Sequence, residues 1–263
     1  METLMGTLLD YFGMIGSEVI YIINELGAII IYLWESFLSI FRFSINFKNL
    51  VDQMAFIGVD SFYIISLTGL FTGMVLSLQS YYFTKMLDVT SMIGPAVALS
   101  MTRELGPVLT ALMITARCGS SMASEIGAMK VTEQIDALEV MAVDPFYFLT
   151  VPRVLASVIM LPIMTVLCSL FGIIGGYIVY GYFMGLNKIT YINGIYQYIK
   201  LGDIYNGLLK AAIFGIIFST ISTFKGFTTS GGSKGVGRST TQAVVLSSIY
   251  ILFADYILTS ILF

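Results

Sequence analysis

The chain has 263 residues, of which 57% are hydrophobic and only 11% are charged, and its formal net charge is −3. Soluble domains carry about 25% charged residues, so this composition, with a mean hydropathy of +0.90, excludes an ordinary soluble domain and predicts a membrane protein. The sequence contains no histidine and only two cysteines, so a zinc-type site and a structural disulfide are not expected.

The first 50 residues are expected to form a separate helical region. Apolar residues dominate from Val19 to Phe41, but Glu18, Glu25 and Glu35 recur within this stretch. A helix that lies in the membrane interface accommodates these carboxylates better than a span with Glu35 near its centre. The pattern therefore favours an interfacial helix over residues 1–50 and leaves a spanning helix as the alternative.

Five later segments are apolar over a length that can cross a bilayer, which requires about 20 residues per helix. They lie near residues 57–79, 93–116, 154–183, 207–224 and 242–263. The third is longer than a bilayer needs, which indicates a tilted helix or one that projects beyond the membrane. The expected fold is an all-α membrane protein with an N-terminal interfacial helix and one membrane domain over residues 51–263.

The basic residues predict an orientation, because they gather in cytoplasmic loops. A cytoplasmic N-terminus places eight of them on the cytoplasmic side: Arg42, Lys48, Arg117, Lys130, Arg153, Lys225, Lys234 and Arg238. Four fall on the opposite side: Lys85, Lys188, Lys200 and Lys210. This balance favours a cytoplasmic N-terminus and a C-terminus on the far side.

Arg103 and Glu104 interrupt the second span, and the apolar stretches on either side are each too short to cross alone. The two side chains therefore lie in the hydrocarbon or in a wet cavity, at a cost of about 2.5–3.5 kcal/mol each if they are unpaired. Sequence neighbours point in different directions on a helix, so each needs a partner elsewhere. Asp255, in the last span, is a candidate partner for Arg103. An ion-pair network that fixes helix packing and a polar lining for a ligand are both open.

A charged segment over residues 117–153 separates the second span from the third. Its helical spacing gives an apolar face (Val131, Ile135, Leu138, Ala142) and an acidic face (Glu133, Asp136, Glu139). Thr132 is expected to cap this helix, and Asp144-Pro145 to end it. Membrane-surface helices usually carry basic polar faces, so an acidic one favours docking to a protein partner over lying on lipid.

Two patterns of small residues, Gly69-x-x-x-Gly73 and Gly172-x-x-x-Gly176, predict close helix approach, either within one subunit or between two. A third glycine-rich pattern, Gly232 to Ser239, imitates a phosphate-binding loop. Arg238 stands where that motif needs lysine, and no strand is expected before it, so nucleotide binding is rejected in favour of a cytoplasmic turn.

One block carries a family resemblance. Arg103-Glu-Leu-Gly-Pro-Val-Leu-Thr-Ala-Leu, followed by Ala-Ser-Glu125-Ile-Gly-Ala-Met-Lys-Val-Thr-Glu-Gln-Ile-Asp-Ala-Leu-Glu-Val-Met-Ala-Val-Asp-Pro145, closely resembles the MlaE-type permease family of ABC transporters. Val151-Pro-Arg-Val-Leu-Ala and Gly235-Val-Gly-Arg-Ser-Thr-Thr-Gln-Ala-Val-Val match it too. The resemblance runs from about Gly69 to the C-terminus.

This resemblance implies that the domain over residues 51–263 is the permease subunit of a phospholipid transporter of the bacterial inner membrane. It implies a homodimer with two cytoplasmic ATPase subunits and an MCE-domain protein on the far, periplasmic side. ATP would be hydrolysed on the ATPase subunits, so the chain itself would be no enzyme and would carry no cofactor.

The resemblance also implies two sets of site residues. Residues 125–145 would form the coupling helix that seats in the ATPase, through Glu125, Glu133, Ile135, Asp136, Leu138 and Glu139. A lipid pocket at the dimer interface would be lined by Arg103, Glu104, Leu76, Gln79, Phe83 and Leu105. Arginine suits a phosphate headgroup because its planar fork donates two parallel hydrogen bonds.

Two other classes of function stay open. An ion-coupled secondary transporter could use Arg103, Glu104 and Asp255 as a relay, but it predicts paired broken helices in an inverted repeat, which the sequence does not show. A scaffold that anchors the ATPase and the MCE partner without moving lipid is the other.

Overall fold

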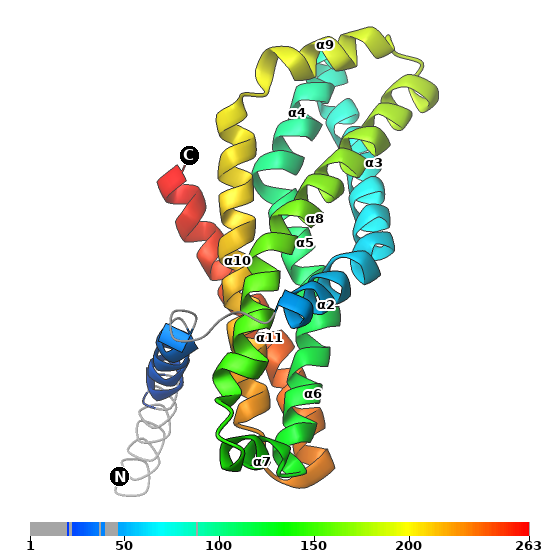
Figure 1. The fold of residues 1–263 in the computed structure, drawn as a ribbon. Helices are drawn as coiled ribbons and strands as arrows, with labels where there is room; N and C mark the ends of the chain where they lie inside the picture. Colours follow the sequence, from blue (N-terminus) through cyan, green and yellow to red (C-terminus); the bar gives the residue numbers. More distant parts are fainter. Residues whose placement is uncertain (1–19, 21–22, 37, 40–46, 88, 263) are drawn as a thin grey trace, which may run out of the picture.

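The computed structural model describes residues 20, 23–36, 38–39, 47–87 and 89–262, which form an elongated helical bundle (Figure 1). Within this part of the chain every regular element is a helix. Five helical runs are long and apolar enough to cross a membrane: Phe47–Met86, Thr90–Val131, Phe146–Phe183, Leu201–Phe227 and Gly232–Leu262. The prediction of an all-α membrane protein with five spans is therefore confirmed.

Each run is a chain of helical pieces. The first contains α2 (Phe47–Ile57), η1 (Val59–Ser61) and α3 (Phe62–Met86). The second contains η2 (Thr90–Met92), α4 (Ile93–Ser100), η3 (Met101–Leu105), α5 (Gly106–Ile114), η4 (Thr115–Gly119) and α6 (Ser120–Val131). The third contains η5 (Phe146–Thr150), α8 (Val151–Ile178) and η6 (Val179–Phe183). The last two are α10 (Leu201–Phe227) and α11 (Gly232–Leu262).

Every run is longer than the segment predicted for it. The apolar signal marks only the part of a helix that must be free of charge, whereas backbone hydrogen bonding continues past it. Two short helices, α7 (Gln134–Val140) and α9 (Lys188–Tyr198), lie at opposite ends of the bundle (Figure 1).

Helix α9 was not among the predicted elements. The side chain of Asn187 accepts a hydrogen bond from the backbone N–H of Ile189 at 2.9 Å and so caps its first turn. Tyr191 is 1% exposed, and its hydroxyl donates to the carbonyl oxygen of Ile173 in α8 at 3.1 Å. An N-cap and one buried tyrosine thus hold α9 against the bundle.

Helices α3 and α8 pack at almost backbone contact. A Cβ atom on Gly73 would lie 1.8 Å from the carbonyl oxygen of Gly172, and one on Gly69 would lie 2.4 Å from that of Cys168. Ser77 donates from its hydroxyl to the carbonyl oxygen of Gly176 at 3.2 Å. The two small-residue patterns therefore face each other within one chain.

The junctions of α7 differ from the prediction. Thr132 lies at the C-terminal end of α6, where its hydroxyl donates to the carbonyl oxygen of Ala128 at 2.9 Å, so its expected role as N-cap is wrong. Glu133 precedes α7 in the left-handed region, with φ of 61°. The helix ends at Val140, and Asp144 accepts from the N–H of Phe146 at 2.9 Å. Asp144 thus begins the next helical run instead of ending α7.

The expected turn at Gly232 to Ser239 is also wrong, since these residues form the first two turns of α11. The chain reverses just before them, and Gly231 and Gly232 adopt φ of 89° and 68°. Glycine has no Cβ and enters this region of backbone space without strain. The glycines serve the reversal between α10 and α11.

The N-terminal helix is described over residues 23–36. The Tyr32 ring lies 5.1 to 5.8 Å from the rings of Phe146, Phe224 and Phe227, and Glu25 forms an ion pair with Lys225. Glu25 and Tyr32, two turns apart, thus contact the same turn of α10, so this helix runs across α10. Of the predicted interfacial helix, Glu18, Val19 and Phe41 lie outside the described residues. Its place in the membrane interface stays a prediction.

We expect Gly73→Ala to destabilise the protein, because its methyl group would collide with the backbone of α8. Overpacking of this kind costs about 1–3 kcal/mol. Thermal unfolding of the purified chain in mild detergent measures the loss. Gly237→Ala is the matched control, since nothing lies within 4 Å of a Cβ there and alanine is the better helix former. Equal unfolding temperatures for the two variants would contradict the close packing of α3 on α8.

Candidate functional site

The site is built on a local defect in the second helical run. Residues Met101–Leu105 form a π-helical turn between α4 and α5 and carry both Arg103 and Glu104. A π-turn inserts one extra residue into the helix and is common at functional sites. Ser169 of α8 donates from its hydroxyl to the carbonyl oxygen of Met101 at 3.0 Å, which ties the turn to the bundle.

Arg103 is held by a carboxylate at the start of α10. Its Nε and Nη2 atoms donate to Oδ1 of Asp203 at 2.9 and 2.6 Å. Asp203 is buried, and its Oδ2 accepts from the backbone N–H of Lys200 at 3.0 Å, so the same side chain also caps α10. Asp203 is therefore the carboxylate that pairs with Arg103, where the sequence suggested Asp255.

Glu104 and Asp255 share a lysine. Lys210 of α10 is fully buried, and its Nζ lies 2.6 Å from Oε2 of Glu104 and 3.1 Å from Oδ1 of Asp255. Its ammonium also donates to the hydroxyl of Thr259 at 2.6 Å. The count of basic residues assigns Lys210 to the far side of the membrane, and the structure shows that it lies in α10 with its ammonium group paired inside the bundle.

These contacts form two sets of ion pairs across the second run, α10 and α11, and the neighbouring residues Arg103 and Glu104 bring the two sets together. We call them the charge cluster: Arg103, Asp203, Glu104, Lys210 and Asp255. Each charged group has an opposite charge in hydrogen-bonding reach, which offsets much of the cost of removing it from water. The cluster therefore links these three runs, as the packing hypothesis requires.

The cluster is not sealed inside the chain. The side chain of Arg103 is 38% exposed and that of Glu104 is 36% exposed, whereas those of Lys210 and Asp203 are at most 7% exposed. Part of the two predicted site residues thus faces outwards from the bundle. This outward face is what a ligand or a second copy could reach.

Sequence reasoning missed Asp203, Lys210 and Thr259. A signal was present, since Asp203 and Lys210 are seven residues apart and lie on one face of α10. Asp255 and Thr259 are four apart on α11 and likewise share a face. Polar residues at helical spacing in two apolar runs indicate an internal polar seam.

The predicted pocket walls lie on two elements. Leu76 and Leu105 are half-buried against the core of the bundle. Gln79 is exposed and Phe83 is 68% exposed, and both lie on α3. The outward stripe of α3 is thus apolar with one amide, while the ion pairs of Arg103 and Glu104 are made with α10 and α11.

The apolar face of α7 packs on its own chain. Ile135 is 2% exposed and belongs to a cluster with Ile126 and Leu149, and Leu138 packs against the same cluster. Ile135 therefore packs α7 onto its own chain. Its side chain is not accessible to a partner in this structure, whereas the sequence predicted a contact role for it.

The opposite face of α7 is open. It presents the acidic residues Glu133, Asp136 and Glu139, and next to them Val140 and Met141, which are 88% and 64% exposed. Lys130 pairs with Asp136 at 2.8 Å. An exposed surface with acids around two large apolar side chains has the composition of a protein contact.

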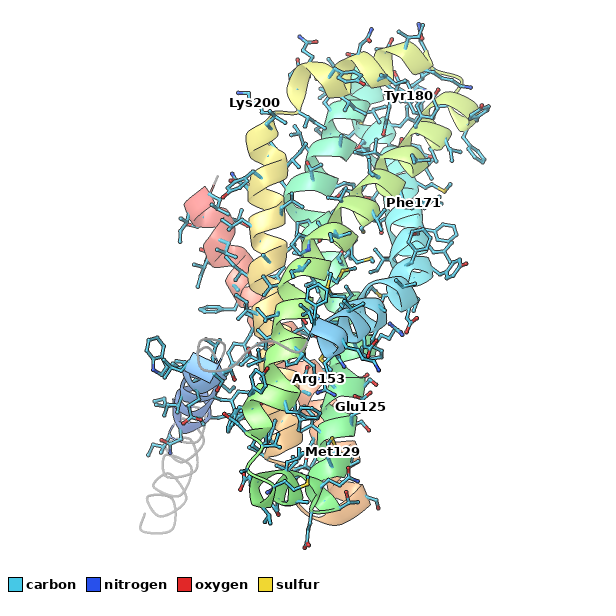
Figure 2. All side chains as sticks on the ribbon, viewed as in Figure 1. Glu125, Met129, Arg153, Phe171, Tyr180 and Lys200 are labelled. Atoms are coloured by element: carbon cyan, nitrogen blue, oxygen red, sulfur yellow. The ribbon has the colours of Figure 1, made fainter. Side chains whose placement is uncertain are left out.

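A buried arginine joins the elements that flank α7. Arg153 of α8 is 7% exposed, and its Nη2 lies 3.0 Å from Oε2 of Glu125 in α6 (Figure 2). Its Nη1 donates to the carbonyl oxygen of Leu149 at 2.7 Å. Glu125 thus fastens α6 to α8, and a displacement of α7 would be passed to both runs.

A second arginine contacts the junction between α2 and α3 in the first run. Arg117, in the π-turn η4, donates from Nη1 to the carbonyl oxygen of Phe56 at 2.9 Å and to the hydroxyl of Ser61 at 2.7 Å. Its Nη2 lies 3.3 Å from Oδ2 of Asp60. One guanidinium therefore holds the α2–α3 junction against the second run.

Among the described residues no group of three or more cysteine, aspartate and glutamate side chains could hold a metal ion. The arrangement offers paired charges and apolar walls. It can bind an amphipathic molecule, and it can pass a displacement between its two ends.

Replacing Lys210 with Met is expected to destabilise the chain, because it leaves the carboxylates of Glu104 and Asp255 without their shared cation. Breaking a fully buried pair from one side costs about 3–5 kcal/mol, and the partial exposure of both carboxylates lowers this cost. Adding Glu104→Gln and Asp255→Asn should restore most of the loss, since it removes the orphaned charges.

Thermal unfolding in detergent distinguishes these variants. Lys234→Met is the matched control, at an exposed lysine of α11. The cluster would not be a folding element if Lys210→Met and Lys234→Met unfolded at the same temperature.

The family model described as Permease MlaE matches residues 50–261. A probable ABC transporter permease protein of Rickettsia bellii is 41% identical over 97% of this chain and 99% of its own length. The intermembrane phospholipid transport system permease protein MlaE of Haemophilus influenzae is 37% identical over 97% and 98%. The chloroplastic protein TRIGALACTOSYLDIACYLGLYCEROL 1 of Arabidopsis thaliana is 36% identical over 86% and 65%. A match of this extent across five helical runs shows that the chain belongs to the MlaE permease family.

Proposed function

We propose that the chain is the membrane subunit of an ABC transporter that moves phospholipid between membranes. Two copies would form the permease, two cytoplasmic ATPase subunits would drive it, and an MCE-domain protein would exchange lipid with it on the far side. The Haemophilus relative is named for intermembrane phospholipid transport and aligns over almost its full length, which supports this substrate class.

The observation that carries the proposal is the partial exposure of the charge cluster. Arg103 and Glu104 are more than one-third exposed in a run that crosses the membrane. A charged group facing acyl chains is costly, and such groups face protein or a wet cavity. The exposed part therefore calls for a polar cover, which a phospholipid headgroup between two copies would supply.

In this arrangement Arg103 would bind the headgroup phosphate. A guanidinium donates in a planar fork, and Asp203 already holds Arg103 in a fixed orientation through Nε and Nη2. The acyl chains would lie along Leu76, Leu105 and Phe83, with Gln79 at the edge of the apolar wall. A second copy would place its own α3 opposite and close the pocket.

The exposed face of α7 would dock in the ATPase. The second run joins it to the headgroup site, since Glu104 and Glu125 lie 21 residues apart in one continuous helical run, about 32 Å at the rise of an α-helix. The Glu125–Arg153 pair fastens the lower part of this run to α8. A movement of α7 would therefore reach Arg103 as a rigid displacement.

The α7 end of the bundle would face the cytoplasm, and α9 the periplasm of a bacterial inner membrane. The basic residues divide eight to four in favour of this orientation. The N-terminus would then be cytoplasmic and the C-terminus periplasmic.

The two rival functions make different predictions. An ion-coupled transporter could use Lys210, Glu104 and Asp255 as a proton relay, and its transport would follow a proton gradient and ignore ATP. A scaffold would hold the partners together and transfer no lipid. Neither explains both an exposed acidic α7 and a half-exposed headgroup site.

Reversing the charge on α7 should release the ATPase. We expect Glu133→Lys/Glu139→Lys and, separately, Val140→Asp to abolish co-purification, because both replace exposed contacts and leave the packed face intact. Leu138→Asp should unfold the region instead, since Leu138 packs on the core.

Pull-down of the ATPase on tagged permease, with the unfolding temperature measured in parallel, separates the two effects. An ATPase retained by a folded Glu133→Lys/Glu139→Lys permease would count against the docking role.

Removing Arg103 should lower the phospholipid bound to the purified complex. Arg103→Ala alone strands the Asp203 carboxylate, so Arg103→Ala/Asp203→Asn is the better variant. Asp203→Asn by itself is the matched control, because it keeps the guanidinium. Lipid extraction and mass spectrometry give the lipid-to-protein ratio. An unchanged ratio in the double variant would refute the headgroup role.

A further inference from the structure

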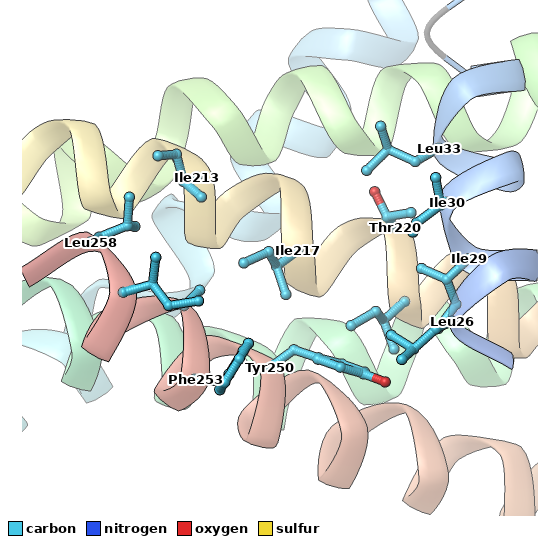
Figure 3. Close-up of a pocket in the computed structure, with 13 residues that line it drawn as sticks. Leu26, Ile29, Ile30, Leu33, Ile213, Ile217, Thr220, Tyr250, Phe253 and Leu258 are labelled. Atoms are coloured by element: carbon cyan, nitrogen blue, oxygen red, sulfur yellow. The ribbon is translucent and has the colours of Figure 1, made fainter. Parts of the chain in front are cut away.

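A groove between the N-terminal helix, α10 and α11 lies outside the proposed transport site. It contains two neighbouring cavities of about 330 and 360 Å³. Figure 3 shows the first of them, with the N-terminal helix at one end, where it crosses α10, and with α11 along another side. The two cavities differ in chemistry, and this difference indicates what binds there.

The first cavity is apolar. It is lined by Leu26, Ile29, Ile30 and Leu33 of the N-terminal helix, by Ile213, Ile217, Thr220 and Ile221 of α10, and by Tyr250, Phe253, Ala254, Ile257 and Leu258 of α11. Ile30, Phe253 and Ile257 are 65%, 60% and 40% exposed. The cavity is therefore bounded by side chains on the outer surface of the bundle, from which an acyl chain of the bilayer could enter.

The second cavity is polar. It is lined by Asn24, Glu25, Phe224, Lys225, Thr228, Ser239 and Gln242. Lys225 is 6% exposed and forms an ion pair with Glu25. Hydroxyl and amide groups surround this pair, which carries no net charge.

The two cavities are adjacent in the fold. Glu25 and Leu26 are neighbours on the N-terminal helix, and Ile221 and Lys225 are one turn apart on α10. Because α10 runs towards the α7 end of the bundle, the polar cavity lies on that side and the apolar cavity lies nearer the middle (Figure 1). The groove thus has a polar end and an apolar end, in the order in which a lipid of the α7-side leaflet presents its headgroup and chains.

We propose that this groove binds one phospholipid per chain, with a zwitterionic ethanolamine headgroup in the polar cavity and an acyl chain in the apolar one. Lys225 would donate to the phosphate, and Glu25 would accept from the ammonium group. A neutral pair of opposite charges complements a zwitterion, whereas an anionic headgroup would leave Glu25 beside a second negative charge. The bound lipid would join the N-terminal helix to α10 and α11.

The polar end of the groove is far from the headgroup site proposed at Arg103. Asp203 and Lys225 are 22 residues apart on α10, about 33 Å at the rise of an α-helix. The apolar cavity reaches closer to the charge cluster, since Ile213 is one turn from Lys210 and Ala254 is next to Asp255. A headgroup in the polar cavity would therefore leave Arg103 free. Free phosphate could occupy the polar cavity alone, but it has no group for the apolar one.

The test is native mass spectrometry on the full chain, purified in mild detergent, stripped of lipid and titrated with phosphatidylethanolamine. Use of Arg103→Ala/Asp203→Asn as the background removes the transport site from the count. We expect one lipid per chain. Ala254→Phe, which fills the apolar cavity, should weaken binding by about tenfold or more.

Val245→Phe is the matched control, since Val245 is 51% exposed on α11 and does not line the cavity. Its affinity for phosphatidylethanolamine should equal that of the background chain. Unchanged binding to Ala254→Phe, or equal weakening by both substitutions, would overturn the proposal.

A second variant tests the headgroup and does not depend on the folding of Ala254→Phe. The chain with an intact Glu25–Lys225 pair should bind phosphatidylethanolamine more tightly than phosphatidylglycerol. Glu25→Gln/Lys225→Gln should remove this preference. Inorganic phosphate should not compete with the lipid. Equal binding of the two lipids to the unmodified pair, or displacement of lipid by phosphate alone, would show that the site is not a zwitterionic lipid site.

Discussion

The buried ammonium of Lys210 is the constraint on which the rest of the structure depends. A charge within a membrane-spanning run must be paired, and Lys210 finds Glu104 on the second run and Asp255 on the last. The second run is thereby fixed relative to the last two runs, α10 and α11. The same contacts hold the π-turn that presents Arg103, so the packing of the bundle and the orientation of the candidate headgroup site have one physical cause.

The two ends of the second run serve different purposes. Near one end, charges are paired but partly open, which suits a site that must accept and release a charged ligand. At the other end, Ile135 and Leu138 are packed against the chain, and the acids of α7 face outwards. Because α7 packs on its own chain, a displacement of α7 would be transmitted to the bundle. The Glu125–Arg153 pair would pass this displacement to both the second run and the third run. The groove under the N-terminal helix adds a further place where lipid could stabilise the assembly.

Much of this could be predicted from the sequence. Apolar length identifies five spans, and the cost of an isolated charge marks Arg103 and Glu104 as residues that need partners. Composition cannot say which partners, because that depends on how α10 is rotated and where it begins. Asp203 was missed since it caps α10 from outside the predicted span.

Local signals misled at three positions. Thr132 has the chemistry of an N-cap, yet it ends α6 and bonds back to Ala128. The glycines near residue 232 suggest a turn, yet only Gly231 and Gly232 adopt positive φ, and Gly235 and Gly237 lie inside α11. Ile135 belongs to an amphipathic stripe, and only tertiary packing shows that its own chain already covers it.

The most direct test of the account is lipid transfer by the reconstituted transporter, with permease, ATPase and MCE partner in one set of vesicles and labelled phospholipid followed into another. Transfer should require ATP, should stop in the Val140→Asp permease, and should be indifferent to a proton gradient. Transfer that follows the proton gradient without ATP, or an assembled complex that moves no lipid, would contradict the account.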